Sequence, residues 1–226
     1  MRPYVLIAFI TSLLFLIVPT CEKPVETPSE LVLSASNAYY LDTRIDYNSY
    51  MSARNGLLSL RKDRPRYLII TTPGGQVFYG KLLKEFIKEN KINTICFRFC
   101  GSMGTVVFNA GSQRLITENT KLFFHEWFFT QISGNITSVR KQVDDFDVSF
   151  MKENSEIARR SGMNPYRFVR TVRKDTTFTT SEILEAGLAD GQVKMFLDPA
   201  NPPRKATDSP DPEIIEISII PQVLER

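Results

Sequence analysis

Histidine is nearly absent from this sequence, and cysteine is scarce. Of 226 residues only His125 carries an imidazole, and the three cysteines stand at positions 21, 96 and 100. A zinc site needs three or four such ligands at short, characteristic spacings. The sequence does not offer that set, so we expect no metal. Phosphate-binding glycine motifs are missing too, and we expect no cofactor.

A disulfide between two of these cysteines is not expected either. Cys96 and Cys100 lie four positions apart in an apolar segment. On an extended strand four residues span about 13 Å, whereas the Cα atoms of a disulfide-bonded pair lie within about 7 Å of each other. The spacing therefore predicts two buried thiols.

The chain also lacks an excess of charge. Lysine and arginine number 28 against 25 acidic residues, a formal net charge of +3, and the two kinds are interspersed. Nucleic-acid-binding proteins gather basic residues into a patch or stripe, so we expect no nucleic acid as a partner. A content of 42% apolar and 23% charged residues is that of a globular protein, here long enough for one domain without a covalent staple.

The apolar run at the N-terminus is too short to cross a membrane comfortably. It extends from Val5 to Val18 behind a single basic residue, Arg2, whereas a spanning helix needs about 20 residues. This pattern is typical of a signal peptide, here residues 1–20, with an uncleaved anchor as the alternative. We predict that the protein is exported, either periplasmic or anchored to a membrane.

The end of that run resembles a bacterial lipoprotein box. It reads Val18-Pro19-Thr20-Cys21, with Thr20 where the box prefers Gly, Ala or Ser. Cys21 would then be lipidated. Residues 21–30, which include two prolines, would form a polar tether.

The rest of the chain alternates between strand and helix patterns. A β-branched run, Tyr67–Thr72, stops at Pro73-Gly74-Gly75, and the amphipathic helix 77–90 follows. A second strand, 92–99, leads through Gly101-Ser102-Met103-Gly104 into a helix at 105–110. Further strands are expected at 30–35, 38–41, 115–116 and 122–124, and further helices at 47–60 and 138–160. The order predicts an α/β fold with a largely parallel sheet and outer helices.

The C-terminal third contains a helix start and a linker. Thr179 and Glu182 have the spacing of a capping box, and Gly187 ends the short helix that it opens. Five of the 13 prolines fall in 198–212, and the tail 213–220 is apolar and β-prone. We therefore divide the chain into a folded domain at 31–197 and a proline-rich linker with a tail at 198–226. The tail could add an edge strand or meet a partner.

The two glycine-rich turns are where chemistry is expected. Each ends a buried strand and opens a helix, which directs backbone N–H groups toward one point above the sheet. The second turn carries a serine, Ser102, which is a weak nucleophile until a base takes its proton. His125, which follows the apolar run 122–124, is the one histidine that could do so.

These motifs together resemble the proteolytic subunit of the Clp protease. The matching segments are Pro73-Gly74-Gly75-Gln76-Val77, Gly101-Ser102-Met103-Gly104 with Ala110-Gly111, Phe124-His125, Ser161-Gly162, Lys174-Asp175, and Ser181-Glu182 with Gly187-Leu188-Ala189-Asp190. The resemblance covers roughly residues 39–193. It implies the ClpP/crotonase-like fold, built from repeated β-β-α units, and a serine peptidase whose substrate is peptide.

The resemblance also assigns roles to individual residues. It implies Ser102 as nucleophile, His125 as general base and Asp175 as the residue that orients it, with oxyanion-hole N–H groups from Gly75 and Met103. Residue types alone do not single out Asp175, because Asp144, Asp145, Asp147 and Asp190 are also available. We do not expect the Glu126 side chain to orient the ring, since adjacent strand residues point to opposite faces.

The chain departs from the family pattern just after the histidine. Where the family has Gln-Pro, this sequence has Glu126-Trp127 followed by Phe128 and Phe129. This aromatic group would form a hydrophobic subsite or pack against another subunit. Residues 134–160 match in length the family's handle, which joins two rings, so a homo-oligomer, with a ring as one possibility, is expected.

The predicted function is that of an exported serine peptidase. Because ATP-driven unfoldases work in the cytosol, we expect it to act without ATP and without an AAA+ partner. A crotonase-fold acyl-thioester enzyme would use the same oxyanion hole without a nucleophile. A signal-peptide-peptidase-like enzyme would need a lysine base, which we cannot place, and a membrane-tethered scaffold would need no triad at all.

Overall fold

The computed structural model describes residues 29–129 and 132–206. The signal peptide, Cys21 and the apolar tail therefore lie outside the described residues. The elements are β1 (Ser29–Leu33), β2 (Ala38–Leu41), α1 (Tyr47–Leu58), β3 (Tyr67–Thr72), α2 (Val77–Glu89), β4 (Asn93–Gly101), α3 (Met103–Asn109), β5 (Arg114–Ile116), β6 (Lys121–Phe124), α4 (Ile136–Arg160), α5 (Pro165–Val172), β7 (Thr176–Phe178), α6 (Thr180–Glu185), β8 (Gly191–Leu197) and β9 (Arg204–Lys205). Within these ranges no helix combines the length and the apolar character needed to cross a membrane.

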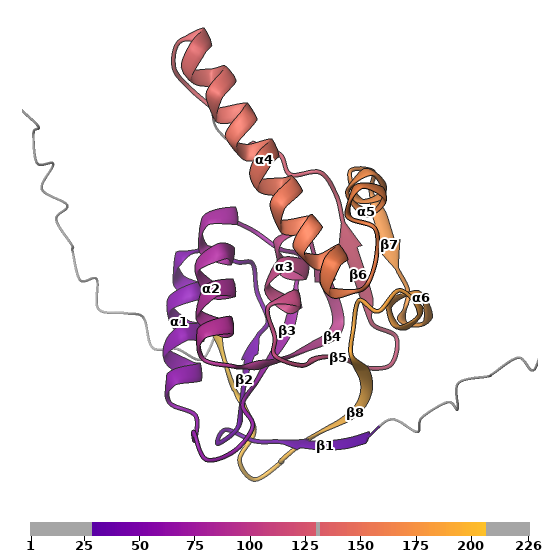
Figure 1. Cartoon of the computed structure of the whole chain (residues 1–226). Coiled ribbons are helices and arrows are strands. Elements are labelled where there is room, and N and C mark those ends of the chain that lie inside the picture. The colour runs from indigo at the N-terminus through magenta and orange to yellow at the C-terminus, as the bar shows by residue number, and fades with distance from the viewer. Residues whose placement is uncertain (1–28, 130–131, 207–226) are drawn as a thin grey trace, which may run out of the picture.

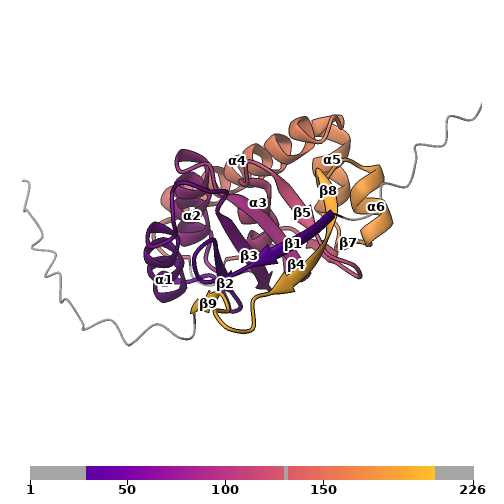
Figure 2. The same cartoon turned by 90° about the horizontal axis from the view of Figure 1, so that it is seen from below.

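The strands form one curled sheet in the order β1-β8-β5-β4-β3-β2-β9, and β6 and β7 branch from β4. Every described pairing is parallel except that of β6 with β7. Helices α1, α2, α3 and α4 lie on one side of the sheet, and β1 and β8 curl beneath the other (Figures 1 and 2). This confirms the predicted α/β class and the ClpP/crotonase-like fold.

Alternating side chains of the buried strands fill two cores. Leu68 and Ile70 of β3 point into the larger cluster, under the helices. Their neighbours Tyr67 and Ile69 point into a smaller cluster on the opposite face of the sheet. A strand buried on both faces explains why this segment is a continuous apolar run.

Helix α4 projects from the body of the protein (Figure 1). Asn135 caps its start by accepting a hydrogen bond from the Ser138 N–H, at 2.9 Å. Its 25 residues make it about 37 Å long. Only the second half is anchored in the core, through residues such as Phe150 and Ile157.

A buried ion-pair network joins α4 to α2. The Lys84 ammonium donates to Glu153 Oε2 at 2.6 Å and to Glu156 Oε2 at 2.5 Å, and Lys84 and Glu153 are both about 95% buried. Burial opposes the charged form of Lys84, but the hydrogen bonds with the two glutamates raise its pKa. Lys88 contacts the other oxygen of Glu156 at 2.6 Å.

The expectation of two free thiols is wrong, because Cys96 and Cys100 form a disulfide. Strand β4 is not regularly extended between them: Ile70 pairs with Cys96 and Thr72 with Cys100, so four steps along β4 face two along β3. The extra residues bulge at Arg98, whose φ is 66°. The bulge brings the two Cα atoms to 6.1 Å, within disulfide reach.

Part of the segment expected as a linker is ordered against the sheet. The Asp198 N–H donates to the Leu33 carbonyl at 2.8 Å, and the Ala35 N–H donates to the Asn201 carbonyl at 2.9 Å. Beyond them, β9 pairs in parallel with β2. Residues 198–206 thus run from β8 across the underside of the sheet to its other edge (Figure 2).

Candidate active site

Ser102 stands at the turn between β4 and α3 in a strained backbone conformation. Its φ of 51° and ψ of −123° are rare for a residue with a side chain. The Ser102 N–H donates to the Phe123 carbonyl at 2.7 Å, and its carbonyl accepts from the Thr105 N–H at 3.0 Å and the Thr105 hydroxyl at 2.7 Å. A sharp strand-to-helix turn of this kind presents a nucleophile at the end of a sheet.

The Pro73-Gly74-Gly75 turn lies directly beside Ser102. Gly74 has a φ of 100°, and a Cβ placed on it would come within 2.7 Å of the Ser102 Cβ and of the Gly101 carbonyl oxygen. Only glycine permits such an approach. Neither the Gly75 N–H nor the Met103 N–H has an acceptor among the described residues. Both donors sit where the sequence predicts an oxyanion hole.

His125 directly follows β6, the strand that pairs with the end of β4. Gly101 is the register partner of Phe123, so the serine turn and the histidine meet at the carboxyl ends of adjacent parallel strands. The His125 Nδ1 lies 2.6 Å from the Glu126 carbonyl oxygen. The ring also stacks with Phe123 and Phe128, at centroid distances of 5.4 and 5.6 Å.

Asp175 directly precedes β7, the strand that pairs in antiparallel fashion with β6. In the antiparallel β6–β7 pair, Phe124 is the partner of Thr176. This is the last pair of the ladder, and His125 and Asp175 are the residues that follow and precede it in their own segments. Among the described residues, however, the His125 ring is hydrogen-bonded neither to Asp175 nor to Ser102, and its polar contact is with the Glu126 carbonyl.

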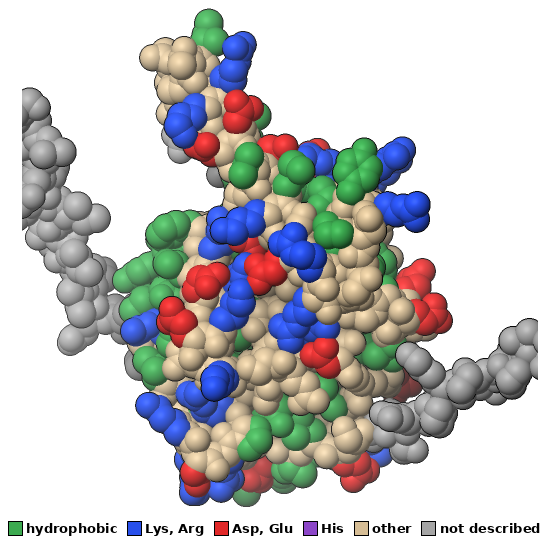
Figure 3. Space-filling view, viewed as in Figure 1, with side chains coloured by type: hydrophobic (Ala, Val, Ile, Leu, Met, Phe, Trp, Pro, Cys, Tyr) green, Lys and Arg blue, Asp and Glu red, His purple; other side chains and the backbone are tan. Residues whose placement is uncertain are grey.

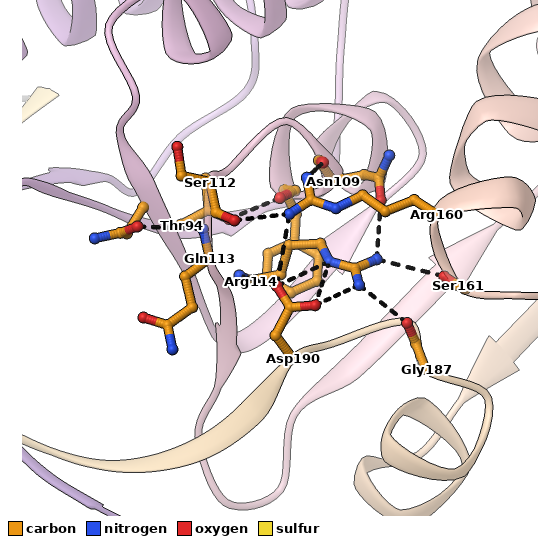
Figure 4. Close-up of polar contacts among 11 residues, drawn as sticks. Thr94, Asn109, Ser112, Gln113, Arg114, Arg160, Ser161, Gly187 and Asp190 are labelled. Atoms are coloured by element: carbon orange, nitrogen blue, oxygen red, sulfur yellow. Dashed lines mark hydrogen bonds and ion pairs between the residues drawn. The ribbon is translucent and has the colours of Figure 1, made fainter.

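The other candidate aspartates have partners elsewhere. Asp190 binds the guanidinium of Arg114 at 2.5 Å (Figure 4), at the start of β5, whereas Ser102 follows the end of the neighbouring parallel strand β4. Asp147 binds Arg173, and Asp145 binds Lys141 on the surface of α4. Asp144 is exposed on the same helix. Of the candidate aspartates, Asp175 is thus the one that adjoins the strand paired with β6.

The residues after His125 are fixed against α4 by contacts that the sequence did not predict. Trp127 packs on Phe146 and Phe150, with centroids 5.6 and 5.5 Å apart, and Phe129 lies 4.3 Å from Phe146. The Glu126 side chain pairs with Arg173. The aromatic run could be noticed in the sequence, whereas nothing in the sequence marked Arg173.

Comparison with known proteins agrees with this architecture. The sequence model of the Clp protease family matches residues 30–195. Similar proteins include the ATP-dependent Clp protease proteolytic subunit 3 of Streptomyces coelicolor, 26% identical over 165 residues that cover 70% of this chain and 76% of that protein. Subunit 1 from Prochlorococcus marinus is 28% identical over 134 residues, 57% of this chain and 67% of that protein. The chain therefore belongs to the Clp protease family, a family of serine endopeptidases.

Proposed function

We propose that this protein is a serine peptidase that cleaves peptide bonds through Ser102, His125 and Asp175. The observation that carries the proposal is the strained Ser102 turn, which lies beside the free N–H groups of Gly75 and Met103 and one strand away from His125. A nucleophile, a base and an oxyanion site are the three parts that acyl transfer requires.

The proposed reaction has two halves. The Ser102 hydroxyl oxygen attacks the peptide carbonyl while His125 Nε2 takes its proton, and the Gly75 and Met103 N–H groups bind the oxyanion. The C–N bond then breaks, and His125 returns the proton to the leaving amine. Water attacks the resulting ester by the same route, which frees the acid and restores Ser102. Asp175 stabilises the imidazolium that forms in each half.

A fluorophosphonate probe tests the assignment, because it labels only serines activated by a base. We expect the wild-type protein to be labelled and both Ser102→Ala and His125→Ala to lose labelling. The matched control is Ser112→Ala, which changes an exposed serine near the amino ends of β4 and β5, the end of β4 opposite to Ser102. Labelling that survives His125→Ala would indicate a lysine base. No labelling of the wild-type protein would favour the thioester enzyme or the scaffold.

We further propose that the enzyme is exported and acts without an ATPase on short or unfolded peptides. The support is the signal-like segment 1–20, since an ATP-driven unfoldase would not share its compartment. The relatives named above are called ATP-dependent. An ATP-dependent enzyme would be stimulated by an ATP-driven unfoldase, whereas the enzyme proposed here would not. Stimulation of peptide or protein cleavage by an ATP-driven unfoldase would contradict independence. Recovery of the full-length precursor, with Cys21 unmodified, from the cytosol would contradict export.

A homo-oligomer is also proposed, with the projecting helix α4 as its contact element. Its outer half exposes apolar side chains, among them Ile136 at 81% and Val148 at 65%. Figure 3 shows apolar side chains at the tip and along this helix. Large apolar side chains left exposed on a projecting element support a role as a protein interaction site.

A further inference from the structure

Strand β4 changes its neighbour partway along its length. Its first half pairs with β5, and Cys96 is the last residue of that ladder. Its second half, Phe99–Gly101, pairs instead with β6. Ser102 directly follows this second half, and His125 directly follows β6. The proposed nucleophile and base therefore both adjoin a short ladder that begins only beyond the change of neighbour.

The bulge of β4 lies between these two halves and sets the position of the serine turn. Where β3 takes two steps, from Ile70 to Thr72, β4 takes four. In a regular ladder Gly74 would be level with Cys100, two residues short of Ser102. The bulge brings Gly74 beside Ser102 instead, so close that a Cβ on the glycine would come within 2.7 Å of the serine Cβ. The meeting of the two turns thus depends on the bulge.

The disulfide between Cys96 and Cys100 spans this bulge from end to end. It ties the half of β4 that pairs with β5 to the half that pairs with β6. Both cysteines are fully buried in the core under the helices. Because a disulfide holds its two Cα atoms within about 7 Å of each other, the bond excludes the regular extended form of this segment, which would span about 13 Å.

The backbone of the bulge is unfavourable without such a bond. Arg98 has a φ of 66°, a left-handed conformation in which the Cβ of any L-residue crowds its own backbone. The Thr71 hydroxyl supports the bulge from β3 by donating to the Phe97 carbonyl at 2.6 Å. The Arg98 guanidinium lies over the Phe97 ring at 4.9 Å. Neither contact removes the cost of the left-handed φ, which a glycine at position 98 would remove.

We propose that Cys96 and Cys100 are positioning residues of this active site: their disulfide keeps the bulge closed, and the closed bulge holds Ser102 beside the Pro73-Gly74-Gly75 turn. Neither cysteine takes part in the reaction itself. The inference rests on the proposed function for its catalytic meaning. Its structural content, the conformation of the bulge and of the serine turn, can be measured without any activity.

Alkylation tests whether the bond is present in the purified full-length protein. Iodoacetamide, added to the denatured protein without a reductant, should leave Cys96 and Cys100 unmodified, and both should react once the protein has been reduced. Mass spectrometry of the peptides shows the difference. Modification of both cysteines before reduction would overturn the proposal.

The rate of fluorophosphonate labelling gives the functional readout. We expect the Cys96→Ala/Cys100→Ala double variant to react at least about tenfold more slowly, toward the ~100-fold that a misplaced catalytic group can cost. Adding Arg98→Gly should recover most of the rate, because glycine adopts a left-handed φ without a steric cost. The matched control, Arg98→Ala in the same background, removes the same exposed side chain but keeps the cost, and should not recover it. A double variant that reacts at the wild-type rate, or equal rates with glycine and alanine at position 98, would contradict the positioning role.

Amide hydrogen exchange gives the structural readout. Peptides that cover residues 97–104 should exchange faster in the Cys96→Ala/Cys100→Ala variant than in the wild-type protein, and Arg98→Gly should slow them again. Lys91→Gly is the control, since it relieves another positive φ, of 51°, in the turn before β4 and should leave this exchange unchanged. Wild-type exchange in the double variant would overturn the proposal. If the wild-type protein is never labelled by the probe, the peptidase proposal fails while hydrogen exchange still decides the role of the disulfide.

Circular dichroism separates positioning from loss of the fold. If the Cys96→Ala/Cys100→Ala variant does not fold, the variant that also carries Arg98→Gly takes over the test. It should be folded and should react with the probe near the wild-type rate. A triple variant that is also unfolded would show that the bond stabilises the whole domain and not the bulge in particular, which would overturn the proposal.

Discussion

At the scale of single residues, Asp190 belongs to a polar network that joins α3, α4, β5 and the turn before β8. Its carboxylate receives hydrogen bonds from the Arg114 N–H at 2.7 Å and from the Arg114 guanidinium at 2.5 Å. Arg114 is almost fully buried and also donates to Asn109 Oδ1 and to the Gly187 carbonyl. Figure 4 shows Arg160 reaching the same group from α4. Removing the carboxylate would therefore leave a buried guanidinium without its counter-charge.

We expect Asp190→Asn to lower the free energy of unfolding by about 2 kcal/mol at neutral pH, because the buried Arg114 guanidinium loses its counter-charge although the Asp190 side chain itself is 33% exposed. Burial opposes the charged carboxylate, but its hydrogen bonds with Arg114 keep the pKa of Asp190 below the ordinary 3.8. A folded-state pKa below the unfolded value adds stability above the unfolded pKa, and this stability is lost as the pH falls through the folded pKa.

Urea denaturation at a series of pH values measures this difference. The gap between the wild-type protein and Asp190→Asn should be constant between about pH 5 and pH 8 and should shrink below about pH 4, where the carboxyl becomes protonated. Asp144→Asn, which changes an exposed aspartate of α4 that makes no ion pair among the described residues, serves as the matched control. A gap that widens in acid would contradict the assignment.

Residue types alone pointed to Ser102 and His125, because a serine nucleophile needs a base and the sequence offers a single histidine. Asp175 needed the family spacing, and in the structure it directly precedes β7, the strand that pairs with β6. Arg173 could not be predicted, since its partners Asp147 and Glu126 lie 26 and 47 residues away. The disulfide was missed because a positive φ at an arginine, Arg98, is not readable from sequence.

At the scale of elements, the sequence predicted most strands and helices close to their observed ends. The run 67–72 is β3, and the expected helix 77–90 is α2, one residue shorter. The capping box at Thr179 and Glu182 is confirmed. Short edge strands such as β7 and β9 were not predicted, because two or three residues carry no periodicity. How α2 and α4 pack was also unreadable, because it depends on side chains about 70 residues apart.

Lys84 links α2 to α4 through its ion pairs with Glu153 and Glu156. Replacing Lys84 measures how much these ion pairs contribute to the free energy of unfolding. Lys84→Met leaves the Glu153 carboxylate, 97% buried, with only a distant ammonium of Lys81 at 4.0 Å. We expect the free energy of unfolding to fall by about 3 kcal/mol, because an uncompensated charge remains in the interior.

Two further variants make the Lys84 experiment decisive. Lys88→Met, on the same helix but 41% exposed, should cost less than about 1 kcal/mol. The Lys84→Met/Glu153→Leu double variant should be more stable than Lys84→Met, since both buried charges are gone. Denaturation in urea, with particle mass checked for each variant, gives all three values. A double variant less stable than Lys84→Met would show that the buried charge is not the cause.

At the scale of the whole molecule, the outer half of α4 determines what the protein can assemble with. The helix projects from the body (Figure 1), and residues 29–129 and 132–206 leave apolar side chains near its tip exposed. Ile136, Val139 and Val143 line a hollow of about 400 Å³ there, together with Gly134 and Arg140. Burying one isoleucine side chain gains about 2 kcal/mol, so several such contacts would suffice to hold copies together.

We therefore expect the wild-type protein to run as a multimer in analytical ultracentrifugation and the Ile136→Asp/Val143→Asp double variant to shift toward smaller species. Two carboxylates in this hollow would have to be desolvated on association, whereas they cost little on the exposed helix of a monomer. The control is Phe196→Asp, a 40%-exposed apolar residue of β8, at the opposite end of the molecule from the tip of α4. Its particle mass should equal that of the wild-type protein. An equal mass for the double variant as well would exclude the tip of α4 as the contact, and monomeric wild-type protein at all concentrations would exclude the assembly itself.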